Sequence, residues 1–216
     1  MKLMLDKFYE FLSRPLIGST RIVMALLVVP LVMSFTSPLW QIFMTAPQYP
    51  KGLTMDIFAY KIVGGNDGND INEINTLNHY IGMRKLDAAA SADLDWLPFA
   101  LGAIALIALR AAAIGTVKDL IDTLVVTGYV SAFAFGRFVY RLYVFGHELD
   151  PRAPVKVEGF MPVVWGHKTV ANFETYSYPQ AGSYWLAVYG VGLLALVIIH
   201  LVVGRVRARR EAGAAS

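Results

Sequence analysis

Long apolar stretches constrain this 216-residue chain more than any short motif does. Only 16% of its residues are charged, whereas about a quarter are charged in an average soluble domain. Since ~20 consecutive apolar residues are enough for a helix to cross a bilayer, four stretches qualify as spans: 22–44, 96–117, 120–143 and 184–203. The sequence therefore predicts an all-α integral membrane protein with four transmembrane helices.

The distribution of positive charge predicts how the chain is oriented. Lys and Arg are concentrated in the N-terminal segment 1–21, in the connection between the second and third spans, and in the basic tail 204–216. The two loops expected on the other side, 45–95 and 144–183, together hold seven Lys or Arg against eleven Asp or Glu. By the positive-inside rule both termini are cytoplasmic, and we expect both loops on the periplasmic side of a bacterial inner membrane.

The two outer loops are expected to form a small mixed α/β domain. In the first loop, LTMDIFAYKI (53–62) is typical of a short strand and GGNDGND (64–70) of a turn. The spacing of Ile71, Ile74 and Leu77 then predicts a short amphipathic helix. The second loop is rich in proline, glycine and aromatic residues, so we expect it to be mostly extended and to pack on the first loop or on a partner.

Two residues of the expected helix have the chemistry of copper ligands. His79 and Met83 are four residues apart, which places them on one helix face. Thioether sulfur selects Cu(I), and imidazole accepts either oxidation state of copper. The outer loops add His147 and His167 as further candidate ligands. A surface histidine beside a packing methionine is the alternative that the sequence leaves open.

Two arginines form a second candidate site. Arg137 and Arg141 stand one turn apart near the outer end of the third span, where a buried charge is costly unless it has a partner. They can pair with lipid phosphates or loop acids, or bind an anionic group on a partner or a quinone-like ligand. His200, in the fourth span, has no second histidine at its depth to share a haem.

Several functional classes are not indicated. The chain contains no cysteine, which excludes disulfides and thiolate ligands. It carries no nucleophile elbow, phosphate-binding glycine loop or zinc-protease helix, so we do not expect an enzyme. The small excess of basic residues, 19 against 16 acidic, includes no basic stripe of the kind that binds nucleic acid.

Four outer segments resemble a known family: APQYPKGL, INTLNHYIGM, GHELDPRAPVKV and ANFETYSYP. They are similar to a family of small four-span membrane proteins of unassigned biochemistry. That family is associated with gene clusters for the clade II type of nitrous oxide reductase, a periplasmic copper enzyme of denitrification. The resemblance implies service to a copper enzyme through metal supply, maturation or an electron route from membrane quinol.

Three hypotheses follow for the function. The first is an accessory membrane protein whose periplasmic face binds or delivers copper, or docks a periplasmic copper enzyme such as nitrous oxide reductase. The second is a non-catalytic docking subunit of a larger, respiratory-type membrane complex without a metal. The third is an electron-transfer membrane protein with haem or quinone. All three place the chain in a lipid bilayer with a protein partner on the outer loops.

Overall fold

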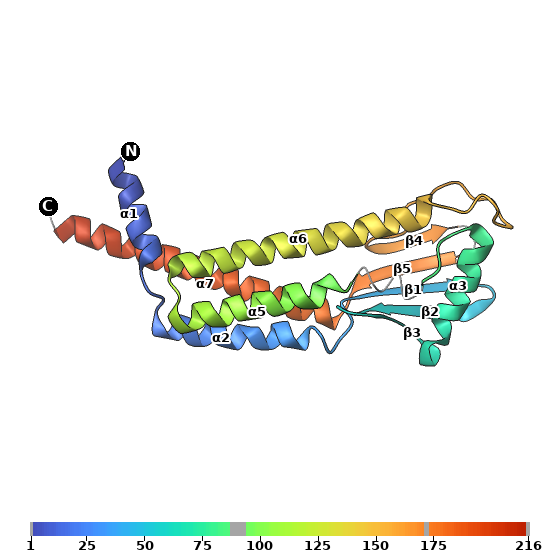
Figure 1. Ribbon diagram of the computed structural model, residues 1–216, viewed down its shortest axis with the longest axis horizontal. Coiled ribbons are helices and arrows are strands. Elements are labelled where there is room, and N and C mark those ends of the chain that lie inside the picture. The colour runs from blue at the N-terminus through green and yellow to red at the C-terminus, as the bar shows by residue number, and fades with distance from the viewer. Residues whose placement is uncertain (1, 87–93, 171–172, 215–216) are drawn as a thin grey trace. The chain divides into compact units, whose positions relative to one another are not determined.

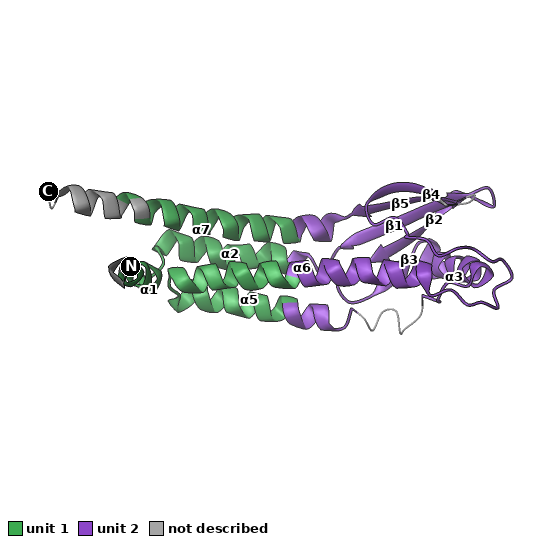
Figure 2. Ribbon diagram, turned by 90° about the horizontal axis from the view of Figure 1, so that it is seen from above, with its two compact units in different colours: residues 1–32, 101–130, 186–216 green, residues 33–100, 131–185 purple. Residues whose placement is uncertain are grey.

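The computed structural model describes residues 2–86, 94–170 and 173–214, which fall into two compact units (Figure 2). The ranges of unit 1 are Met1–Val32, Leu101–Val130 and Leu186–Ser216, and those of unit 2 are Met33–Ala100 and Ser131–Trp185. Unit 1 is helical, and unit 2 contains a sheet, a short helix and the ends of three long helices. Each unit is described by itself.

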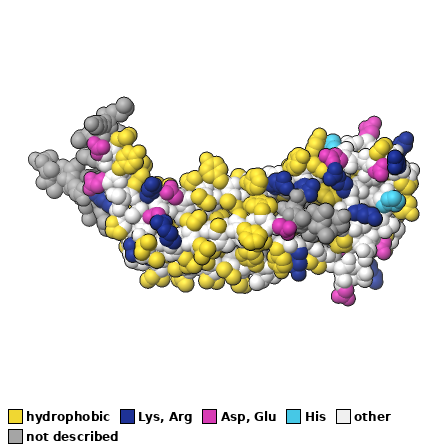
Figure 3. Space-filling view, viewed as in Figure 1, with side chains coloured by type: hydrophobic (Ala, Val, Ile, Leu, Met, Phe, Trp, Pro, Cys, Tyr) yellow, Lys and Arg dark blue, Asp and Glu magenta, His cyan; other side chains and the backbone are white. Residues whose placement is uncertain are grey.

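The described helices include three that are long and apolar enough to cross a membrane. They are α5 (Trp96–Ile114, 19 residues), α6 (Val117–His147, 31 residues) and the Ala181–Gly204 portion of α7 (Ala181–Ala214). In the space-filling view, many hydrophobic side chains lie over the middle of the visible face, where few charged side chains are seen (Figure 3). By length and composition these three helices are candidate membrane spans, and they coincide with the expected second, third and fourth spans.

The expected first span differs from the structure. Helix α2 (Gly18–Met33) follows the shorter α1 (Lys2–Ser13) and has 16 residues, rather than extending to residue 44. Residues 40–44 instead belong to a strand, β1 (Trp40–Ala46). One reason is Pro38, because a proline disfavours the helical conformation in the residue before it, here Ser37. A second reason is that the side chains of β1 alternate between the two faces of the sheet. The prediction of one uninterrupted helix over 22–44 is corrected accordingly.

Both expected outer loops contribute to a single antiparallel sheet (Figure 1). The strands are β1, β2 (Tyr49–Ile57), β3 (Ile62–Gly64), β4 (Gly166–Val170) and β5 (Phe173–Pro179). Their order in the sheet is β3-β2-β1-β5-β4. The central pair β1–β5 joins segments more than 120 residues apart, with Ile42 opposite Ser177 and Met44 opposite Thr175. The second loop is thus packed against the first.

Helix α3 (Asn69–Ile81) lies where the apolar spacing predicts a helix. It follows a short 3-10 turn, η1 (Asn66–Gly68), within the expected turn sequence. Asp70, 3% exposed, accepts hydrogen bonds from the Thr54 N–H (2.8 Å) and from Asn66 Nδ2 (2.6 Å). The buried carboxylate therefore ties the start of α3 to β2.

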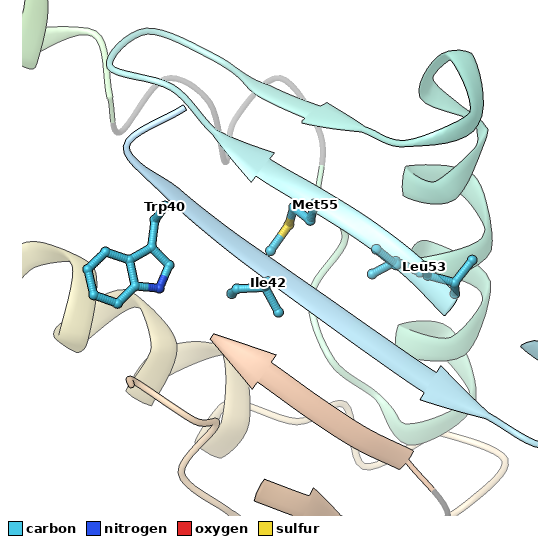
Figure 4. Packing of buried hydrophobic residues seen from close by; sticks show 5 residues of the cluster. Trp40, Ile42, Leu53 and Met55 are labelled. Atoms are coloured by element: carbon cyan, nitrogen blue, oxygen red, sulfur yellow. The ribbon is translucent and has the colours of Figure 1, made fainter. Parts of the chain in front are cut away.

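The core of unit 2 lies on one face of the sheet. Side chains alternate across a strand, so Trp40, Ile42 and Met44 of β1 share the face that Leu53 and Met55 of β2 also use. Figure 4 labels Trp40, Ile42, Leu53 and Met55 of this cluster, and Ile74 belongs to it from α3. Burying a side chain of this size stabilises a fold by about 1.5–3 kcal/mol, so this inner face holds the unit together.

Candidate functional site: a cationic apolar pocket and a polar hollow

An apolar pocket lies against the inner face of the sheet in unit 2. Its volume is about 260 Å³, and every lining residue belongs to this unit. Ile42, Met44 and Met55 form the sheet wall, while Leu77 of α3 and Phe138 of α6 form two others. The pocket is therefore bounded by elements from both outer loops and by the outer part of α6.

Three cationic side chains stand in this apolar lining: Arg137, Arg141 and Lys168. The two arginines are one turn apart on α6, and residues at this spacing occupy the same helix face. Lys168 comes from β4, opposite Thr175 of β5, and its Nζ donates a hydrogen bond to the Met161 carbonyl at 2.8 Å. The structure thus brings the two predicted arginines together in one pocket and adds a lysine that the sequence did not single out.

One wall of the pocket is the beginning of a membrane-length helix. Trp96 and Leu97 line the pocket and are the first two residues of α5. Tryptophan is enriched where a span meets the membrane–water interface, and the 19 residues of α5 extend about 28 Å at 1.5 Å per residue. The pocket is therefore lined in part by the first turn of a helix that is long and apolar enough to cross a membrane.

His79 and Met83 line a second, more polar hollow in unit 2. The hollow lies between the end of α3 and the segment from Glu148 to Ala153. Gly82 ends α3 at φ +78, and a Cβ there would come within 2.8 Å of the Asp150 carbonyl oxygen, so the glycine allows this close approach. Met83 lies beyond this helix end, so the predicted helix face shared by His79 and Met83 does not form, although both residues line the hollow.

Charged residues surround this hollow. Arg84 forms an ion pair with Glu148, and Lys85 and Arg152 also line the hollow. Met83 lines the apolar pocket as well. Among the residues that the structure describes, no group of three or more His, Asp or Glu is placed to hold a metal ion.

The other two candidate ligands lie elsewhere in unit 2 and do not line the hollow of His79 and Met83. His147 ends α6, where its Nδ1 donates to the Tyr143 carbonyl (2.9 Å) and its ring stacks on that of Tyr143, with centroids 3.9 Å apart. His167 is on β4, with its ring 4.6 Å from that of Tyr176. Since strand side chains alternate, His167 faces away from the pocket that its neighbour Lys168 lines.

The sequence did not reveal the pocket itself, because its walls are distant along the chain. The period-two pattern of Trp40, Ile42 and Met44 was the one available signal for the sheet wall. It lay inside an apolar run that was long enough to predict a span. Pairing of β1 with β5 and of β5 with β4 then places Lys168 in the same row across the sheet as Met44, on the face that forms this wall.

Comparisons with protein-family models, curated proteins and solved structures find no match to this chain. Its function is therefore argued from the pocket and the hollow.

Proposed function

We propose that this chain is a membrane-anchored binding protein, rather than an enzyme, whose sheet unit holds a small amphipathic molecule taken from the bilayer. The observation that carries this proposal is the apolar pocket of about 260 Å³ with cationic side chains in its lining. Protein interiors leave few voids larger than a water molecule, and ligand sites are mostly apolar clefts with a few placed polar groups, starting at about 300 Å³. At about 260 Å³ the pocket is slightly smaller than that, and it has the same mostly apolar lining with a few polar groups.

The membrane topology in this proposal follows the positive-inside rule. Helix α2 serves as a fourth, short membrane helix, and both termini are cytoplasmic because of their basic residues. The sheet unit then lies on the periplasmic side of a bacterial inner membrane. A ligand held there is available to a periplasmic or membrane partner, and quinone is one such ligand.

The experiment is to identify what the purified protein retains. The chain is extracted in mild detergent, and bound lipids and quinones are quantified by mass spectrometry. The matched variants are Thr175→Trp, which fills the pocket from β5, and Glu174→Trp, which puts the same side chain on the opposite face of that strand. We expect about one amphiphile per chain in the wild type and in Glu174→Trp, and its loss in Thr175→Trp. Equal retention in all three proteins, or no retention in any, would refute the proposal.

Copper handling is a second candidate function, supported by the shared hollow of His79 and Met83. The carboxylates of Glu148 and Asp150 line the same hollow, although three basic side chains there oppose a cation. The test is a Cu(I) titration against a chromophoric chelator. Binding of one Cu(I) that is lost in the His79→Ala, Met83→Ala variant would support a copper site, and binding unchanged by these substitutions would exclude it.

A further inference from the structure

We propose that α1 is an interfacial helix, which lies along the surface of the membrane that α5, α6 and α7 are long enough to cross. Its apolar face is the binding surface, and its partner is the lipid of that membrane. This inference goes beyond the proposed function and does not depend on the pocket of the sheet unit. The residues that carry it all belong to unit 1.

The sequence of α1 places apolar side chains on one face of the helix. Four of them stand at positions i, i+3, i+4 and i+7, the spacing of a stripe along one side of a helix; this α1 stripe consists of Leu5, Phe8, Tyr9 and Leu12. A stripe that packs on a protein core is buried, but Leu5 and Phe8 are each 54% exposed and Tyr9 is 62% exposed. The described part of the chain therefore leaves most of the α1 stripe uncovered.

Backbone hydrogen bonds place the end of α1 where two candidate spans end. The connection from α1 to α2 pairs with the turn between α5 and α6. The Leu16 N–H donates to the Gly115 carbonyl (3.3 Å), and the Val117 N–H donates to the Arg14 carbonyl (3.0 Å). Since α5 ends at Ile114 and α6 begins at Val117, α1 leaves the bundle beside the ends of two membrane-length helices.

A side-chain contact places α1 beside a third candidate span. The apolar stretch of α7 ends at Gly204, after which arginines follow in the sequence. A Cβ at Gly204 would overlap the Phe11 ring, so the glycine leaves room for this aromatic side chain of α1. Helix α1 is thus held at the level where apolar helix gives way to charge, which is where an interfacial helix lies.

Lipid fits the α1 stripe better than a charged partner does. Segment 2–13 has two lysines and two acidic residues, so its charges balance and offer no strong attraction to a charged surface. The exposed apolar surface also continues onto the spans, because Ile114, next to the Gly115 that binds the α1–α2 connection, is 71% exposed. Tyrosine, which supplies one member of the stripe, is enriched where proteins meet the membrane–water interface.

The test places a nitroxide label at single cysteines of the full-length protein in phosphatidylcholine nanodiscs, since the chain has no cysteine of its own. The matched variants are Phe8→Cys in the α1 stripe and Glu10→Cys, also exposed and nearly opposite because two residues turn a helix by about 200°. Oxygen, which concentrates in lipid, and a nickel chelate, which stays in water, then compete to relax the label. An interfacial helix buries its apolar face about 5–10 Å deep, so we expect the label at position 8 to favour oxygen severalfold and the label at position 10 to favour nickel.

Leu106→Cys, on the exposed surface of α5, serves as the lipid control and is expected to favour oxygen. Matching circular dichroism spectra show that the variants are folded. Equal access of nickel to positions 8 and 10, with the control in lipid, would overturn the inference and leave the proposed function standing. Exclusion of both reagents from position 8 would also overturn it, because protein rather than lipid would then cover the stripe. A label at position 8 that leaves water only when phosphatidylglycerol is added would overturn apolar burial as the basis of binding. Preference for nickel at Leu106→Cys would remove the membrane anchor on which the proposed function also depends.

Discussion

Replacing Ser177 with alanine tests whether a buried chain of side-chain hydrogen bonds stabilises the sheet unit. Ser177 is 0% exposed. Its Oγ accepts a hydrogen bond from Trp40 Nε1 at 2.7 Å and donates one to the Val164 carbonyl at 2.9 Å. Alanine removes this oxygen and leaves the indole N–H without its acceptor inside the core.

The expected loss in the free energy of unfolding is about 2 kcal/mol. A buried polar group that loses its partner costs about 1–3 kcal/mol, and Trp40 is only 9% exposed. The Val164 carbonyl contributes less because its hydrogen bond to Ser177 is only partly buried. Denaturant unfolding followed by tryptophan emission measures the change, and all four tryptophans of the chain lie in unit 2.

A double-mutant cycle isolates the hydrogen bond from the loss of packing. In a Trp40→Phe background no indole N–H remains to be orphaned, so Ser177→Ala should cost about 1–2 kcal/mol less there than in the wild type. The exposed Ser131 supplies a matched serine-to-alanine control, with an expected effect within about 0.5 kcal/mol. An equal cost of Ser177→Ala in both backgrounds would refute the reasoning.

Three further predictions concern the contacts of α3 and its ends with neighbouring segments, and the same unfolding assay measures each. Asp70→Ala should cost about 1–3 kcal/mol because a β2 backbone N–H loses its acceptor. The exposed Glu158→Ala should have little effect, and comparable losses would contradict this. Gly82→Ala should cost more than about 1 kcal/mol, since φ is +78 and the added Cβ meets backbone at 2.8 Å, and a neutral effect would contradict the geometry. The hydrogen bond from the Tyr49 hydroxyl to Glu73 (2.5 Å) raises the pKa of Tyr49. The stability that this hydrogen bond contributes is therefore present below about pH 10 and is lost as pH rises through the higher pKa of the folded state. The wild type should lose more stability over that pH range than Tyr49→Phe, and parallel losses would exclude this contribution.

The elements that the sequence predicts well are those defined by local periodicity or by composition. Helices α5, α6 and α7 follow from long apolar runs, and α3 from the spacing of Ile71, Ile74 and Leu77. Arg137 and Arg141 could be selected as a site because two cations in an apolar run have few structural explanations. Each of these inferences needs only residues within one element.

The elements that could not be predicted depend on contacts between distant segments. An uncharged run such as 22–44 is compatible with a lipid-facing helix and equally with the buried face of a strand, and length alone favoured the helix. Pairing of β1 with β5 carries no local signal, although it creates the pocket and places Lys168 in it. The sequence also could not show that His147 and His167 contact tyrosine rings outside the hollow of His79.

The length of α6 connects the membrane anchor to the pocket. Its 31 residues extend about 46 Å at 1.5 Å per residue, whereas a hydrocarbon core is ~30 Å thick and takes ~20 residues. If the span begins near Val117, it ends near Arg137, and the remaining residues stand at and beyond the head groups. Arg137, Arg141 and Phe138 of this outer part line the pocket. One continuous helix therefore supplies both a membrane-length stretch and a wall of the pocket.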